Sequence, residues 1–199
     1  MREQQPDSEH QGEHTKPELE SKERPRIYVA SLADYNEGRL YGAWFDAAQE
    51  ADELWKNIKK MLEGSPSPGA EEWAIHDYEG FGLLHLNEFE SLEAVAKIAA
   101  GIVEHGPAFA AWALHVGADS DLLDEFEEAY MGEWESGHAF AEEMVDDMGS
   151  LEEIRRSLPN HLADYVEINY DSYLDDLVSL GEISTVEKLD GGVYVFRNW

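Results

Sequence analysis

Carboxylates at helical spacing are the side chains of this sequence best placed to do chemistry. Glu142 and Asp146 are four residues apart, as are Glu143 and Asp147, so each pair lies on one face of a helix. Such a face could bind a divalent cation through its oxygen atoms. The same spacing also describes an ordinary solvated helix face, and both interpretations remain open.

A second acidic stretch begins as a calcium-binding loop does and then departs from the pattern. Asp119 and Asp121 occupy its first and third positions. The sixth position, which needs glycine for a sharp turn, is Asp124, and the last, which supplies a bidentate glutamate, is Tyr130. The stretch therefore does not indicate a calcium loop.

Signatures of catalysis and of cofactor binding are missing. The sequence has no G-x-G-x-x-G fingerprint, no phosphate-binding loop ending in G-K-[ST], no G-x-S-x-G elbow and no H-E-x-x-H pair. Two carboxylates could serve a glycosidase, but 44 acidic residues leave no basis for choosing the pair. We predict a protein that is not an enzyme and has neither a metal nor a cofactor.

The negative charge is large and concentrated in one region. Formal net charge is −30, and residues 26–199 carry 37 acidic and 10 basic side chains of the total. Residues 119–153 hold fourteen carboxylates without a Lys or Arg, and Arg155 and Arg156 are the only basic residues within 98–187. Solvated helix faces usually mix signs because Glu–Lys pairs stabilise the helix. The missing partners indicate that the charge itself has a function.

An acidic surface of this size can imitate a polyanion. Duplex DNA carries about one charge per 1.7 Å, so the net −27 of residues 26–199 matches roughly 46 Å, or about 14 base pairs. Its partners would be proteins with a basic DNA-binding groove. Salt adaptation, in which the charge serves solubility, and a chaperone of basic proteins are the alternatives. The residues predicted to form the surface are Asp119, Asp121, Asp124, Glu125, Glu127, Glu128, Glu133, Glu135, Glu142, Glu143, Asp146 and Asp147.

Composition favours a soluble cytoplasmic protein. The chain has no cysteine, which fits a reducing compartment. Its N-terminus lacks the apolar core of a secretory signal. The most apolar stretch, 94–118, is interrupted by Lys97, Glu104 and the Gly106-Pro107 pair, so we expect no membrane span.

Apolar periodicity predicts an α+β fold. Residues 1–24 are polar and predict a disordered extension. Strands are expected at 26–32 and 72–82, with a helix between them that is capped by Asp46 and ends at Gly64. Helical patterns follow at 91–105, 107–116, 122–130 and 140–148. A capping box at Ser150 predicts the start of another helix, and the pattern at 158–180 predicts one or two more. Asp190-Gly191-Gly192 predicts a closing hairpin.

Three blocks of the sequence, in this order, resemble the ArdA antirestriction family. They read RIYVASLADYNEGRLYGAWFD, WAIHDYEGFG and LPNHLADYVEINYDSYLDDL, and the likeness extends over residues 26–199. It implies an elongated chain of three small segments. These are a mixed α/β segment at 25–90, a helical segment at 91–128 and an α/β segment at 129–199 that ends in the hairpin.

The resemblance also implies a function. Members of this family are homodimeric DNA mimics from mobile genetic elements. They block type I restriction–modification enzymes at the methyltransferase core with its specificity subunit, in the cytoplasm of the bacterial host, without binding nucleic acid themselves. The family's antirestriction motif falls on residues 158–177, in the segment where the dimer forms. Its tyrosines fit a place in the core at least as well as a place in an interface. The motif and dimer residues implied are Leu158, Pro159, Leu162, Asp164, Tyr165, Glu167, Tyr170, Asp171, Tyr173, Leu174 and Asp175.

Overall fold

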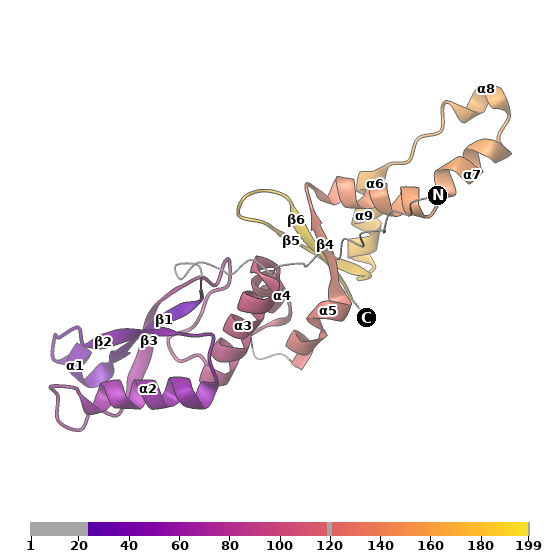
Figure 1. The fold of residues 1–199 in the computed structure, drawn as a ribbon. Coiled ribbons are helices and arrows are strands. Elements are labelled where there is room, and N and C mark those ends of the chain that lie inside the picture. Colours follow the sequence, from indigo (N-terminus) through magenta and orange to yellow (C-terminus); the bar gives the residue numbers. More distant parts are fainter. Residues whose placement is uncertain (1–23, 119–120, 199) are drawn as a thin grey trace, which may run out of the picture.

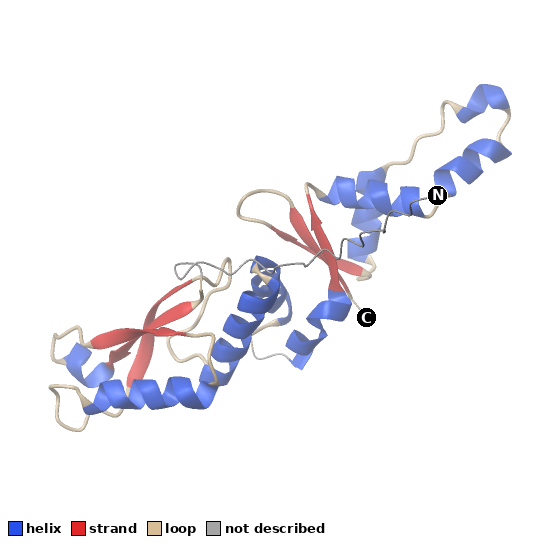
Figure 2. Cartoon of the chain, viewed as in Figure 1, coloured by secondary structure: helices blue, strands red, loops and turns tan. Residues whose placement is uncertain are grey.

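The computed structural model describes residues 24–118 and 121–198 and confirms an α+β fold. Figure 1 shows an elongated molecule in which the chain runs from the first sheet to the far end and then turns back, so that its last two strands lie near the middle. Two small antiparallel sheets lie apart from each other, with helices between them and beyond the second sheet (Figure 2). The extension predicted for residues 1–24 lies outside the described residues except for Arg24.

The first sheet has the order β2-β1-β3, with β1 (Arg26–Ser31) paired antiparallel to β2 (Gly42–Asp46) and β3 (Trp73–Glu79). The short helix α1 (Leu32–Asn36) follows β1 directly. Helix α2 (Ala51–Glu63) packs against the sheet and against the next helix along the chain, as its buried apolar stripe requires.

The middle of the molecule is helical. It consists of α3 (Leu92–His105), α4 (Pro107–Val116), the 3-10 helix η1 (Asp121–Glu125) and α5 (Phe126–Ala129). The Ser91 hydroxyl caps α3 by accepting a hydrogen bond from the Ala94 N–H, at the start of the helical pattern in the sequence. Proline at the first position of α4 makes the break between the two long helices.

The second sheet has the order β4-β6-β5, from β4 (Tyr130–Trp134), β6 (Val193–Arg197) and β5 (Ile183–Glu187). The predicted hairpin is confirmed, and Gly191 and Gly192 both have the positive φ that its turn requires. Helices α6 (Gly137–Asp147) and α9 (Tyr170–Ser179) pack together beside this sheet.

Helices α7 (Ser150–Ser157) and α8 (Asn160–Ala163) form an arm that extends beyond α6 at the end of the molecule (Figure 1). No described side chain of either helix is buried. Gly149, with φ of 65°, precedes α7 at the N-cap, one residue before the capping serine that the sequence predicts.

Strand β6 connects two hydrophobic cores. Tyr194 and Phe196 point to one face and belong to the large core, which runs through the helical middle to the first sheet. Val195 points to the other face and joins a small core beside α6 and α9, with Phe140, Leu177 and Ile183. Because the large core is continuous, the three predicted segments share apolar contacts, and the division at 25–90, 91–128 and 129–199 stays a prediction.

Three local expectations are wrong. Helix α2 begins at Ala51, because Asp46 ends β2 and its carboxylate accepts a hydrogen bond from the Ala48 N–H. Strands β2 and β4 do not appear among the expected elements. The helix expected at 122–130 starts as a 3-10 turn and gives way to β4 at Tyr130, where pairing with β6 begins.

Candidate acidic interaction surface

The predicted acidic surface lies on four consecutive elements, η1, α5, β4 and α6, and on the loop between the last two. Ten of its described carboxylates are exposed, and Glu125 is half-buried. Asp119 lies outside the described residues. In Figure 1 the elements that carry these side chains follow one another from the middle of the molecule toward the arm.

Five of these carboxylates come together around one shallow groove of about 460 Å³ between β4 and α6. We call it the acidic groove. Trp134 and Ala139 complete its lining. The carboxylates are Glu133, Glu135, Glu142, Glu143 and Asp146.

Local structure explains why the carboxylates of α6 face outward. The Ser136 hydroxyl starts the helix by accepting a hydrogen bond from the Ala139 N–H at 3.1 Å. Phe140 belongs to the small core, and Ala141 and Val145 are buried as well, which leaves the acidic positions on the exposed face of the helix. Residues 142–147 place four charges within about 7.5 Å of axial rise. That density approaches the roughly one charge per 1.7 Å of duplex DNA.

Strand β4 supplies the other wall through a local irregularity. The register of its pairing with β6 shifts between Tyr130 and Gly132. Beyond the shift, Trp134 packs against the small core while Glu133 remains exposed. The bulge therefore sets which side chains of this edge strand face solvent.

Counter-charges at the surface are few. Lys188 lies 3.3 Å from Glu133 and 3.6 Å from Asp190. Burial opposes its charged form, but the hydrogen bond to Glu133 and the charge of Asp190 raise the pKa of Lys188. Lys97 lies 2.9 Å from Asp124. Across 24–118 and 121–198, no Lys, Arg or His forms an ion pair with the other members of the surface, so most of its charge is not neutralised.

A second group of carboxylates lies on η1 and α5, beside α3. Its members are Asp121, Asp124, Glu125, Glu127 and Glu128. Phe126 and Ala129 anchor this stretch in the large core. The Trp112 indole N–H donates to the Leu122 carbonyl at 2.9 Å and holds the 3-10 turn against α4. The structure therefore separates the predicted surface into this group, the acidic groove and Asp147.

The antirestriction motif divides into two structurally different halves. Its second half lies at the start of and within α9, where Tyr173 and Leu174 pack against the small core. His138 on α6 contacts this half through Asp171, 2.8 Å away, and through the ring of Tyr170. These residues therefore have ordinary packing roles inside one chain, and Asp175 next to them is exposed.

The first half of the motif belongs to the arm. Leu158 follows α7 as its C-cap, and Pro159 precedes α8. Leu162, Asp164 and Glu167 are exposed. Tyr165 is 82% exposed, which is unusual for an aromatic side chain. The arm also exposes an apolar face of Leu162, Tyr165 and Ile154 of α7, which belong to neither hydrophobic core of residues 24–118 and 121–198. We call it the arm face.

The described residues contain no group of three or more His, Asp or Glu side chains placed to hold a metal ion. The carboxylates of α6 thus lie along a face and do not converge on a point. Within the same residues, no helix is long and apolar enough to cross a bilayer.

Two features of the structure could not be predicted from the sequence. Asp34 is a fully buried carboxylate, whose partners Ser65 and Ser67 are more than thirty residues away along the chain. A pocket around Trp55 and Trp73 combines aromatic and acidic side chains from three elements. Acidic residues are too frequent in this chain for either to stand out in the sequence.

The sequence was compared with models of known protein families and with curated proteins. The sequence model of the family described as antirestriction protein (ArdA) matches residues 27–190. No curated protein matches the chain.

Proposed function

The chain belongs to the ArdA antirestriction family, and we propose that it acts as a DNA mimic against type I restriction–modification enzymes. It would occupy the groove in which the methyltransferase core and its specificity subunit bind DNA. The observation that carries this proposal is an exposed acidic surface on consecutive elements with few counter-charges. Action in the cytoplasm of a bacterial host, on behalf of a mobile element, follows from the same proposal.

Electrostatics would supply both capture and competition. A basic groove attracts the unpaired carboxylates over distances of about a Debye length, roughly 8–10 Å at physiological salt. Each exposed ion pair contributes little, on the order of 0.2–1 kcal/mol, so affinity comes from many pairs together. The protein would exclude DNA by occupation alone, as a non-enzymatic inhibitor that itself binds no nucleic acid.

We also propose that the chain is a homodimer joined through the arm. The arm face exposes Ile154, Leu162 and Tyr165, and none of the three belongs to a hydrophobic core of the described residues. Burying such a face against a second copy would remove its apolar side chains from water. A dimer would place two acidic grooves in one particle and extend the imitation of a duplex.

Two other functions fit an acidic protein. A salt-adapted protein would gain stability steeply with molar salt and have no tight basic partner. A chaperone of basic proteins would bind free basic proteins without competing for a restriction enzyme. Family membership favours inhibition over both.

Competition binding tests the proposed function. A type I methyltransferase core is bound to labelled cognate duplex, the purified protein is added, and the displaced duplex is measured by fluorescence anisotropy between 50 and 300 mM salt. We expect displacement at low salt and a steep loss of affinity as salt rises, because charged contacts are screened. If the folded protein displaces no duplex at the lowest salt, the mimic hypothesis is rejected for that enzyme.

Charge removal tests where the mimic surface lies. Glu142→Gln alone should weaken binding by at most about fivefold, since it removes one exposed charge. The triple variant Glu142→Gln, Glu143→Gln, Asp146→Asn should weaken it by about tenfold or more. A matched triple in the first segment, Glu50→Gln, Glu63→Gln, Glu88→Gln, removes the same charge from other exposed positions. Equal losses in both triples would mean that net charge matters and the acidic groove does not.

A further inference from the structure

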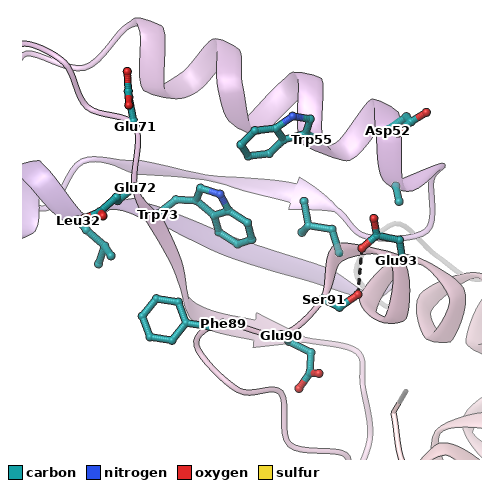
Figure 3. Close-up of a pocket in the computed structure, with 12 residues that line it drawn as sticks. Leu32, Asp52, Trp55, Glu71, Glu72, Trp73, Phe89, Glu90, Ser91 and Glu93 are labelled. Carbon is teal, nitrogen blue, oxygen red and sulfur yellow. Dashed lines mark hydrogen bonds between the residues drawn. The ribbon is translucent and has the colours of Figure 1, made fainter. Parts of the chain in front are cut away.

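A pocket of about 810 Å³ opens between α2, the start of β3 and the start of α3, far along the chain from the acidic groove. Its volume lies in the range of roughly 300–1,000 Å³ that is typical of ligand sites. Figure 3 shows Trp55 and Trp73 near each other in the pocket. Glu71 and Glu72 lie toward one end, and Asp52 and Glu93 lie toward the other.

The aromatic side chains offer open ring faces. The rings of Trp55 and Trp73 are 6.3 Å apart between centroids and inclined at 47°, so they form two walls and do not stack on each other. Trp55 is 43% exposed and Phe89 71% exposed, although both are large apolar side chains. Exposed aromatic residues gathered at a pocket are typical of binding sites.

The carboxylates of the pocket have few counter-charges. Asp52, Glu71, Glu72 and Glu93 are exposed, and no described Lys or Arg lines the pocket. Outside the lining, Lys56 on α2 is close enough to Asp52 for the two charges to interact. The carboxylate of Glu93 accepts hydrogen bonds from its own backbone N–H and from the Ser91 hydroxyl. These bonds lower the pKa of Glu93, which keeps it ionised. Glu90 differs because its carboxylate is buried and accepts hydrogen bonds from Asn87.

The same chain already contains a cation held between a tryptophan and a carboxylate. The guanidinium carbon of Arg26 lies 4.7 Å from the centroid of the Trp44 ring. Its Nη2 is 2.6 Å from the Glu79 carboxylate. The pocket at Trp55 presents the two halves of this arrangement, ring and carboxylate, without the arginine.

We propose that the pocket binds the guanidinium group of an arginine that projects from a basic protein surface. A cation within about 6 Å of an indole face is attracted by the ring, and the guanidinium stacks best because it is planar and weakly hydrated. The carboxylates at either end would accept its N–H groups. That the arginine belongs to a DNA-binding groove rests on the proposed function, whereas recognition of arginine by the pocket does not.

A peptide titration tests the pocket without any restriction enzyme. The tripeptide acetyl-Gly-Arg-Gly-amide is added to ¹⁵N-labelled protein at 50 mM salt while the indole N–H signals of the tryptophans are followed by NMR. We expect saturable shifts confined to Trp55 and Trp73, with Trp44, Trp112 and Trp134 unchanged. The matched citrulline peptide, which keeps the shape without the charge, should bind at least about tenfold more weakly. The lysine peptide should also bind more weakly than the arginine peptide.

Several outcomes would overturn the proposal. These are absence of shifts at Trp55 and Trp73, equal binding of the citrulline peptide, equal binding of the lysine peptide, or shifts spread over all the indoles. Trp55→Ala should abolish the saturable shift at Trp73. Glu72→Gln keeps the apolar contacts and should weaken binding severalfold. Trp44→Ala removes another exposed tryptophan of the first segment and should leave binding unchanged.

The enzyme competition assay separates this proposal from the proposed function. If the tripeptide binds but the wild-type protein displaces no duplex, the pocket stands and the mimic hypothesis fails. If duplex is displaced but the tripeptide does not bind, the pocket proposal fails alone. If both hold, Trp55→Ala should reduce displacement of duplex more than Trp44→Ala does.

Discussion

At the scale of single residues, Asp34 shows how an acidic chain makes use of a buried carboxylate. Its side chain is fully buried and accepts hydrogen bonds from the hydroxyls of Ser65 and Ser67. The Nε of Arg39 lies 3.1 Å away. Burial opposes the charged form, but the serine hydroxyls and the guanidinium outweigh it and hold the pKa of Asp34 well below its usual range. The charge of Asp34, on α1, thus connects Ser65 and Ser67 in the loop after α2 with Arg39 in the loop after α1.

Asp34→Asn should therefore destabilise the protein at neutral pH. The amide introduces N–H donors where the serines and Arg39 also donate, and it leaves Arg39 without its charged partner. The pKa of Asp34 is lower in the folded than in the unfolded chain, where it is near 3.9. Its contribution is therefore complete above about pH 5 and is lost as the pH falls through and below 4. We expect the urea midpoints of variant and wild type to differ at pH 7 and to converge toward pH 2.

The exposed Asp176 on α9 provides the matched control. Asp176→Asn should leave the midpoint nearly unchanged at every pH, as expected for a surface substitution. If Asp34→Asn showed the same acid dependence as the wild type, the charge of Asp34 would not be the stabilising feature.

At the scale of elements, strong apolar periodicity in the sequence predicts the helices, whereas the strands depend on pairing with other strands in the folded protein. The buried stripes and caps of α3 and α4 are visible in the sequence, and both helices form as expected. Strands β2 and β4 are five residues long, lie at sheet edges and bury no residue completely. Their sequences carry little alternation because each strand is defined by its partner, β1 or β6. Only the tertiary fold brings those partners together.

The acidic surface can likewise be predicted from the sequence where it lies on a helix, but not where it depends on a strand. That the carboxylates of α6 lie on an exposed face could be predicted from the positions of Phe140 and Val145. Their meeting with Glu133 and Glu135 around one groove depends on β4, which the periodicity does not reveal. The Trp55 pocket likewise depends on how three elements meet.

Helices α3 and α4 make a close contact that can be tested at Gly101. A Cβ atom at this position would lie 2.3 Å from the ring of the buried Phe109. Gly101→Leu should therefore force the two helices apart and cost about 1–3 kcal/mol of unfolding free energy, as overpacking does. Denaturant unfolding followed by circular dichroism measures the change.

The neighbouring position supplies the control. Ala100 is exposed on the same helix, so Ala100→Leu adds the same side chain toward solvent. We expect a change within about 0.5 kcal/mol. Comparable losses at both positions would show that leucine disturbs α3 itself and that the contact with Phe109 is not responsible.

At the scale of the whole molecule, the elongated shape and the charge are compatible with each other. A net charge of −30 on 199 residues repels itself, and repulsion falls with the distance between charges. The elements are spread along an elongated molecule in Figure 1, which increases the distances between carboxylates at its two ends. The large core that reaches from the first sheet to β6 opposes the repulsion along most of that length.

That core does not extend to the arm, and the arm therefore carries the last prediction. Leu162 and Tyr165 belong to neither core of the described residues and are exposed, so Leu162→Glu with Tyr165→Glu should leave the fold and its circular dichroism unchanged. If the arm face joins two copies, the added charges would be buried against each other and repel. We expect dimer affinity to fall by about 30-fold or more, the loss of roughly 2 kcal/mol that marks an interface hot spot.

Sedimentation velocity over a range of concentrations measures this change. Leu40→Glu, at another exposed apolar position between α1 and β2 at the opposite end of the molecule, should leave the dimer intact. A wild-type monomer at high concentration, or a dimer that tolerates both glutamates, would show that the arm face does not join two copies. A single copy would then have to occupy the DNA groove alone. The restriction enzyme would be the first partner to test for contact with the exposed Tyr165.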